Sequence, residues 1–324
     1  MIMRNKSILT SILVILVVIE LSFIFALSDQ IYTNYTSIAM IINPIKEENI
    51  LFPEDSKLEN FFELAPNRVI EEQWGERTIV QTTNSDTLHE RFEYTIDKPK
   101  DTFRIINLGD SFTYGYGLST QYNYSEVLED LLNDKFQCKK FKKFEVINLG
   151  VSSYDIEYSV ERFKRRGQKY NPDLIVWILK DDDFYNSTIM KVLLRDWAFF
   201  KDKFGFMPPV VRPLNWDWED GGDEEISKDL LRGRIDPREI TSLYSINDYY
   251  TKSLVFLLYS ITSDETAIVE DFAQVREDTY VYKVSNLPDE EVLPNDDHPN
   301  KNGHLALANG LFNYFTENDI IPCS

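Results

Sequence analysis

The feature of this sequence that most constrains its fold is the alternation of short apolar runs with amphipathic segments after residue 101. Apolar runs at 103–108, 144–149 and 174–179 have the length of buried strands, and turn residues border them. A helix is predicted between the first two runs, because apolar residues recur there at helical spacing: Tyr124, Val127, Leu128, Leu131 and Leu132. This alternation predicts an α/β domain with a doubly wound parallel sheet.

The same pattern continues further along the chain. Asp155 is expected to cap a helix that ends near Gly167. A strand is predicted at 254–258, a helix at 264–275 and a last strand at 280–284. A closing helix follows, and its apolar face comprises Leu307, Ala308, Leu311 and Phe315. Right-handed crossovers then place the carboxyl ends of the strands on one edge of the sheet, where the chemistry is expected.

The 324 residues divide into three predicted parts. Residues 1–28 form a hydrophobic N-terminal segment, 29–100 form a stalk or an extra layer, and 101–324 form the α/β domain. Within that domain, about 188–250 is interpreted as an inserted cap. Its aromatic residues suit either a carbohydrate-stacking wall or ordinary packing of the cap on the body, and they include Trp197, Trp216 and Trp218.

The first 28 residues have the pattern of an export segment. Arg4 and Lys6 precede an apolar run at 8–26. A bilayer span takes about 20 apolar residues, whereas a cleaved signal has an apolar core of about 7–15. An uncleaved single-pass anchor in the cell membrane is therefore expected, with the positive flank cytoplasmic and the domain outside. The alternative is secretion after signal cleavage, since 26–28 resembles a cleavage site.

Export changes the interpretation of the two cysteines, Cys138 and Cys323. In an oxidising compartment they could form one disulfide that ties the C-terminus to the domain, and two free thiols are the alternative. Sequons at Asn34, Asn123 and Asn186 are compatible with export.

The charge excludes one class of partner. The formal net charge is −20, whereas surfaces that bind nucleic acid are basic, so no nucleic-acid partner is expected. The same charge disfavours a broad electrostatic contact with anionic lipid. Partners are therefore expected to be a substrate and, through the N-terminal helix, the membrane.

The strongest candidate for chemistry is Ser111, which follows a Gly-Asp pair at the end of a predicted strand. A serine hydroxyl is a weak nucleophile until a base accepts its proton. Of the three histidines, His298 lies in a loop after the last strand, on the same sheet edge. His304 is interpreted as a structural residue at the start of the last helix, and His89 as a surface residue.

Four segments resemble the blocks of SGNH/GDSL hydrolases in order and spacing: NLGDSFTYGYG, VINLGVSSY, PDLIVWILKDDDFYN and DDHPNKNGH. The similarity covers about 101–183 and 290–316. The resemblance implies a flavodoxin-like three-layer α/β/α fold and chemistry with no cofactor and no metal. It also implies that Ser111 is the nucleophile and His298 the base. The backbone N–H groups of Ser111 and Gly150 would donate to the oxyanion.

The sequence departs from the family pattern at Asp182, where an asparagine amide usually donates to the oxyanion. An ionised carboxylate cannot donate, and losing one donor typically costs about 10²–10³ in rate. A raised pKa of Asp182 beside Asp181 and Asp183 would restore a donor, or Asn186 would supply it. The three adjacent aspartates are otherwise interpreted as an acidic loop facing water, because consecutive strand residues rarely converge on one cation.

The triad acid is the second departure. Most family members place an aspartate three residues before the histidine, where this chain has Asn295. Asp296 and Asp297 are the nearby carboxylates, and some relatives use the residue two before the histidine. We therefore expect Asp296 to orient His298.

These residues predict a serine-dependent hydrolase that removes acyl groups from a small molecule, a cell-surface glycan or a lipid. One alternative is a polysaccharide O-acyltransferase that uses the same nucleophile. Another is a catalytically impaired SGNH-fold module that binds glycan, for which Asp182 is the main argument.

Overall fold

The computed structural model describes residues 49–51, 53, 58, 61–74, 77–185, 235–294 and 296–323. They belong to one compact unit, made of 45–195 and 231–324. The expected export segment at 1–28 lies outside the described residues. So do Asn34, Asn186, Trp197, Trp216 and Trp218.

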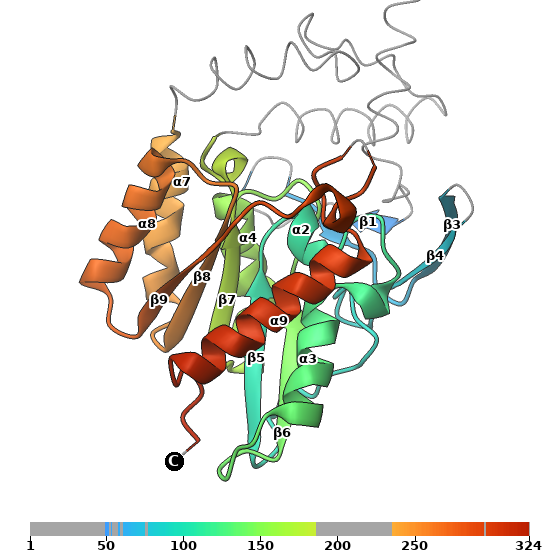
Figure 1. Ribbon diagram of the computed structural model, residues 1–324, viewed down its shortest axis with the longest axis horizontal. Coiled ribbons are helices and arrows are strands. Elements are labelled where there is room, and N and C mark those ends of the chain that lie inside the picture. The colour runs from blue at the N-terminus through green and yellow to red at the C-terminus, as the bar shows by residue number, and fades with distance from the viewer. Residues whose placement is uncertain are drawn as a thin grey trace, which may run out of the picture. The chain divides into compact units, whose positions relative to one another are not determined.

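The centre of this unit is one parallel sheet of five strands, shown in Figure 1. The strands are β5 (Thr102–Leu108), β6 (Lys143–Asn148), β7 (Leu174–Leu179), β8 (Ser253–Tyr259) and β9 (Thr279–Val284). Their order is β6-β5-β7-β8-β9, and every neighbouring pair is parallel. The second strand in the chain thus lies at one edge beside the first, which is the flavodoxin-like order. The predicted parallel α/β sheet is confirmed.

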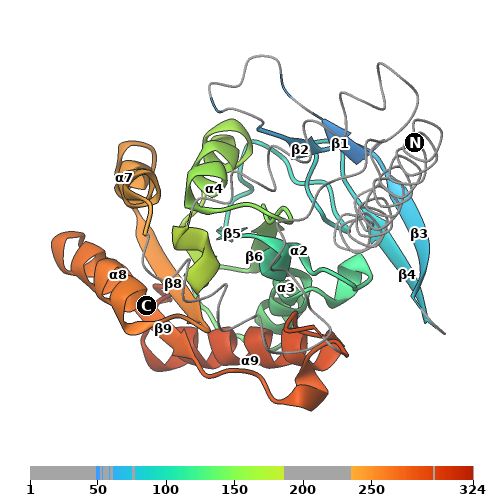
Figure 2. The same ribbon diagram turned by 90° about the horizontal axis from the view of Figure 1, so that it is seen from above.

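Helices cover both faces of the sheet (Figure 2). One face packs against α3 (Tyr124–Lys135) and α9 (Lys301–Glu317), and the other packs against α4 (Ile156–Arg162), α7 (Pro237–Ser245) and α8 (Ser263–Val275). Alternate residues of each strand enter opposite cores, as a pleated strand requires. Ile105 joins the α3 and α9 side, for example, while Ile106 joins the other.

The short elements complete the described chain. The helix α2 spans Ser111–Tyr114, and α4 continues as a π-helical turn at Phe163–Gly167. The remaining turns are of the 3-10 type and lie at Thr120–Tyr122, Gln168–Tyr170, Asp181–Phe184, Ile246–Asp248 and Asp289–Glu291. As expected, Asp155 caps α4, because its side chain accepts from the N–H of Tyr158.

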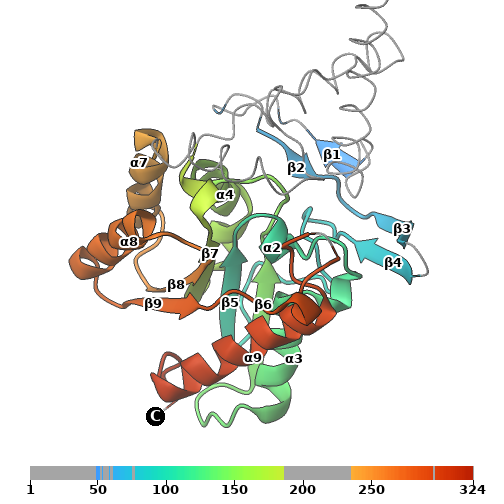
Figure 3. The same cartoon turned by 45° about the horizontal axis from the view of Figure 1, so that its top comes forward.

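The described part of 29–100 packs on the α/β domain. It contains two antiparallel pairs, β1 (Ile50–Leu51) with β2 (Glu63–Leu64) and β3 (Val69–Trp74) with β4 (Arg77–Thr82), visible in blue in Figure 3. Glu63 of β2 accepts a hydrogen bond from Arg162 of α4, with Nη1 and Oε1 2.7 Å apart. His89 is fully buried, so the prediction that it lies on the surface is wrong.

The last part of the region interpreted as an insert belongs to a helical layer. Residues 237–245 form α7, which packs against α4. Leu243, Ile246 and Tyr250 are buried in the core on that face of the sheet. The rest of the predicted insert, up to residue 234, lies outside the described residues.

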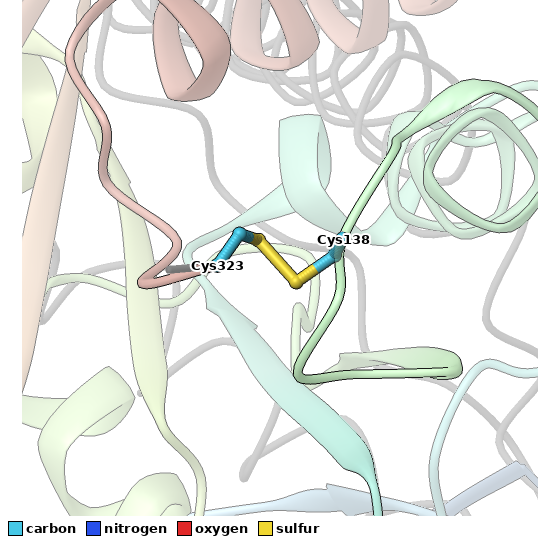
Figure 4. Close-up of a disulfide and its surroundings, with 2 residues drawn as sticks. All are labelled: Cys138 and Cys323. Atoms are coloured by element: carbon cyan, nitrogen blue, oxygen red, sulfur yellow. A yellow bond between two sulfur atoms is a disulfide. The ribbon is translucent and has the colours of Figure 1, made fainter.

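The two cysteines form a disulfide (Figure 4). Their Cα atoms are 5.0 Å apart, and 185 positions separate them in the sequence. Cys138 follows α3, and Cys323 lies beyond α9 at the end of the chain. The disulfide therefore joins the segments that follow two neighbouring helices.

Two structural findings concern the expected export. In the part of the chain that the structure describes, no helix is long and apolar enough to cross a membrane. The Asn123 side chain is buried and caps α3 by accepting from the N–H of Glu126, so this sequon offers no accessible attachment point for a glycan.

Candidate active site

The carboxyl end of β5 holds Ser111 at the first position of α2. Gly109 precedes it with a φ of 144°, where a Cβ atom would lie 2.4 Å from Ile178 Cγ2, so only glycine fits. Asp110 then caps the helix, because its Oδ1 accepts from the N–H of Phe112 at 2.9 Å. Ser111 is half-buried at the switch point between β5 and β7, where α/β folds bind ligands.

The loop before α9 brings His298 to this serine. His298 Nε2 lies 2.7 Å from Ser111 Oγ, although the two residues are 187 positions apart. The loop is fixed by its own backbone, since Leu293 N–H donates to the His298 carbonyl at 2.9 Å. The imidazole also packs between Phe112 and Tyr116, with ring centroids 4.9 and 4.6 Å away. The histidine is thereby oriented before any substrate binds.

Asp296 supplies the carboxylate on the other side of the imidazole. Its Oδ1 lies 2.5 Å from His298 Nδ1 and also accepts the His298 N–H at 2.9 Å. Burial favours a higher pKa for Asp296, but the bonds and charge of His298 together with Lys180 outweigh it, and the pKa is lowered. Asp297 Oδ1 is 3.8 Å from Nδ1 and its side chain is 77% exposed. Ser111, His298 and Asp296 thus form one connected chain, while Asn295 lies outside the described residues.

The predicted oxyanion donors are not equivalent. Gly150 lies against the backbone of α2, since a Cβ there would be 2.4 Å from Tyr114 N. Its N–H, however, already donates to Asn148 Oδ1 at 2.8 Å. The N–H of Ser111 has no acceptor among the described residues, so it is available to a substrate.

The side chain of Asp182 is engaged as an acceptor and is not a free hydrogen-bond donor for the oxyanion. It lies in the 3-10 turn Asp181–Phe184 after β7, and its side chain is 66% exposed. Its Oδ1 is 3.1 Å from the ammonium of Lys180, so it acts as the acceptor of an ion pair.

The acidic loop faces water only in part. Asp183 is buried, and its Oδ2 accepts the backbone N–H of Lys180 at 2.8 Å. Burial, then the charges of Asp110 and Asp182, raise the pKa of Asp183 well above its usual range. The expectation that all three aspartates face water is wrong for this residue, because they form a turn and not an alternating strand.

Among the residues that the structure describes, two groups of side chains offer metal-ligating atoms within 4.8 Å of one another. In the first, Asp296 Oδ1 is already hydrogen-bonded to His298 Nδ1, and His298 Nε2 is hydrogen-bonded to Ser111 Oγ. In the second, the Lys180 ammonium lies beside Asp110 and Asp182 and supplies a positive charge there. Both groups therefore have partners within the chain.

Lys180 was not singled out from the sequence. Its side chain is 9% exposed, and its Nζ lies 3.2 Å from Asp110 Oδ2. Burial lowers the pKa of Lys180, but Asp110, Asp182 and Asp183 more than reverse this and raise it well above its usual range. The signal was present in the sequence: Lys180 directly follows β7, at the carboxyl end of the strand beside β5.

The two other histidines are buried and contact Tyr114 and Tyr124 near the site. His89 Nδ1 lies 2.6 Å from the Tyr114 carbonyl and its ring stacks on Tyr114, with centroids 4.1 Å apart. His304 accepts the N–H of Tyr124 at 3.0 Å, which agrees with a structural role. Burial lowers the pKa of His89 to about 4 and that of His304 to about 3. Both remain neutral near pH 7.

No protein-family model and no curated protein matches the chain. Solved structures that resemble it include a two-domain esterase active on acetylated mannans, crystallised with mannopentaose, at 14% identity and a TM-score of 0.41. Another similar structure is that of a protein of the G-D-S-L family from Desulfitobacterium hafniense. The match to the two-domain esterase covers 68% of this chain and 50% of that esterase, so this chain spans about half the length of the esterase. TesA has 12% identity and a TM-score of 0.42, with 67% and 99% of the two chains covered. The psychrotrophic esterase EstA from Pseudoalteromonas sp. has 15% identity and a TM-score of 0.40, with 66% and 97% covered.

Proposed function

We propose that this chain is a serine hydrolase that cleaves ester bonds through an acyl-enzyme on Ser111. One observation carries the proposal: the continuous hydrogen-bonded chain Ser111–His298–Asp296, with donor–acceptor distances of 2.7 and 2.5 Å. These are the nucleophile, base and orienting acid of a triad in their required contacts. The triad lies at the carboxyl edge of the sheet, where such folds bind ligands.

The first half-reaction forms the acyl-enzyme. Ser111 Oγ bonds to the carbonyl carbon of the ester while its proton moves to His298 Nε2. The carbonyl π electrons move onto oxygen, which becomes an oxyanion facing the Ser111 N–H. When the C–O bond of the ester breaks, the alcohol leaves with the proton from His298. Asp296 holds the imidazole in position and stabilises its positive charge throughout.

The second half-reaction releases the acid. His298 accepts a proton from a water molecule, whose oxygen bonds to the acyl carbon, and the proton returns to Ser111 as the acyl–Oγ bond breaks. A sugar hydroxyl in the place of water would make the same protein an O-acyltransferase. We propose an acylated glycan or lipid as the natural substrate, with water as the acceptor.

The test uses the full-length chain with a short-chain p-nitrophenyl ester and a fluorophosphonate probe that labels active serines. We expect turnover and labelling in the natural protein, and the loss of both in Ser111→Ala and His298→Ala. Ser85→Ala is the matched control, because Ser85 is exposed and bonds only to Glu93 among the described residues.

The outcomes separate the alternatives. No turnover and no labelling, from a protein whose folding is shown by its circular dichroism, would favour a glycan-binding module. Labelling with little release of p-nitrophenol by water, but rapid release when a sugar acceptor is added, would favour acyl transfer.

We also propose that the domain is exported and held at the cell membrane by residues 1–28. The disulfide between Cys138 and Cys323 supports export, because such bonds persist in oxidising compartments. Cell fractionation with alkaline carbonate extraction tests the anchor. Recovery of a shortened chain in the medium would show cleavage and secretion instead.

A further inference from the structure

Lys180 is the one lysine that reaches the catalytic centre in the described part of the chain. Its Nζ lies 3.2 Å from Asp110 Oδ2, and Ser111 Oγ is 3.4 Å from that same carboxylate oxygen. The ammonium and the nucleophile therefore lie within about 7 Å of each other, a distance at which charges interact strongly in a partly buried site.

The lysine is held in a defined position. Its ammonium lies 4.3 Å from the centroid of Phe112, the ring that also packs on His298. Asp110 and Asp182 each approach it on a further side, at 3.2 and 3.1 Å. Asp110 Oδ2 and both carboxylate oxygens of Asp182 lie within 3.3 Å of the ammonium, and these two residues are its acceptors in the described part of the chain. The ammonium therefore acts on the site through its positive charge.

The site has few other hydrogen-bond donors for an oxyanion. The carboxylate of Asp182 accepts from the Lys180 ammonium, and the N–H of Gly150 is already bonded to Asn148. Among the predicted donors that the structure describes, only the N–H of Ser111 has no partner, whereas removing a single oxyanion donor typically costs about 10²–10³ in rate.

We propose that the Lys180 ammonium stabilises the oxyanion formed on Ser111, in the role that an amide at position 182 would otherwise have. Asp110 and Asp182 place the ammonium, and the negative charge that develops on the carbonyl oxygen strengthens its interaction in the transition state. This inference rests on the proposed ester hydrolysis.

Lys180→Met and Lys180→Arg test the proposal in the full-length chain. Methionine keeps the length of the side chain and removes the charge, so we expect kcat for p-nitrophenyl acetate to fall about 10²–10³-fold with KM within about 3-fold. Arginine keeps the charge and is expected to recover at least tenfold of that loss. Lys283→Met is the control, since this lysine is 56% exposed and pairs with Glu270 away from the site.

A boronic acid inhibitor separates oxyanion stabilisation from a structural role. Its boron bonds to Ser111 Oγ and becomes a tetrahedral anion as the serine proton moves to His298, so it resembles the transition state. We expect its affinity for Lys180→Met to fall by the same factor as kcat/KM. Labelling by the fluorophosphonate measures the fraction of folded sites.

Three results would overturn the inference. The first is a kcat for Lys180→Met within 3-fold of the natural protein. The second is an unchanged affinity for the boronic acid while activity and thermal stability fall together, which would make the lysine structural. The third is an effect confined to the KM of anionic esters, which would make it a substrate-binding residue. An inactive, unlabelled natural protein would instead overturn the proposed function, and this inference with it.

Discussion

Asp296 and Asp297 are neighbours in the sequence, but only Asp296 reaches the imidazole of His298. Its Oδ1 lies 2.5 Å from Nδ1, whereas Asp297 Oδ1 is 3.8 Å away on a side chain that is 77% exposed. The backbone N–H of His298 donates to the same Oδ1 of Asp296, which holds the carboxylate in place.

Asp296→Asn is expected to lower kcat by about 10²–10⁴-fold, because an amide neither fixes the tautomer of His298 nor stabilises its charge. Asp297→Asn differs by one position and should change kcat less than about 3-fold. Steady-state kinetics with p-nitrophenyl acetate measure both. Equal losses in the two variants would contradict the assignment of the acid.

The ion pairs of Glu63 are expected to stabilise the packing of the described part of 29–100 on the α/β domain. Its side chain is 2% exposed, and it accepts from Arg162 at 2.7 Å and from Arg166 at 2.8 and 2.9 Å. Glu63→Gln leaves the buried Arg162 uncompensated and should lower the free energy of unfolding by about 3–5 kcal/mol. Urea denaturation followed by circular dichroism measures the change.

An exposed pair provides the control for that experiment. Glu270 and Lys283 lie 2.6 Å apart with side chains 47% and 56% exposed. Glu270→Gln should change the free energy of unfolding by less than about 1 kcal/mol, because solvent screens such pairs. If Glu63→Gln lowered the free energy of unfolding by as little as Glu270→Gln, the stability of the protein would not depend on the ion pairs of Glu63.

His89 should make the stability depend on pH in a defined direction. Its pKa is lowered by burial to about 4 in the folded state, from 6.5. Between these values the unfolded state binds a proton that the folded state does not, so this contribution is complete above pH 6.5 and is lost as the pH falls toward 4. His89→Gln should remove about 1.4 kcal/mol per pH unit from the slope within that window.

Urea denaturation of both proteins from pH 7.5 to 4.5 measures that difference. The comparison between the variant and the natural protein is needed because Glu129, whose pKa burial raises to about 7, acts in the opposite direction. Parallel pH profiles for the two proteins would show that His89 does not remain neutral in the folded state.

The disulfide is expected to contribute to stability by restricting the unfolded chain. It joins positions 185 residues apart, and the chain-entropy model allows up to about 5 kcal/mol for such a loop. Replacing both Cys138 and Cys323 by serine should lower the free energy of unfolding by about 2–5 kcal/mol. Dithiothreitol should destabilise the natural protein and leave the double variant unchanged. If dithiothreitol destabilised the natural protein and the double variant equally, its effect would not arise from this disulfide.

The sequence alone predicted the parallel sheet and placed Ser111 and His298 at its carboxyl edge. The strands and helices could be predicted because burial imposes a local pattern of apolar residues on a strand or on one face of a helix. Examples are the apolar run at 174–179 and the apolar face of the last helix. Ser111 and His298 were readable because each follows a strand, and parallel strands end on the same edge.

Tertiary structure decided what depends on contacts between distant segments. His89 looked like a surface residue because nothing near it in the sequence shows that Tyr114 and Thr120 enclose it. The ion pair between the carboxylate of Asp182 and the Lys180 ammonium also depends on the turn that follows β7, which the sequence pattern does not specify. Local sequence specifies which face of an element is apolar, whereas the electrostatic partner of a buried charge depends on how the elements pack.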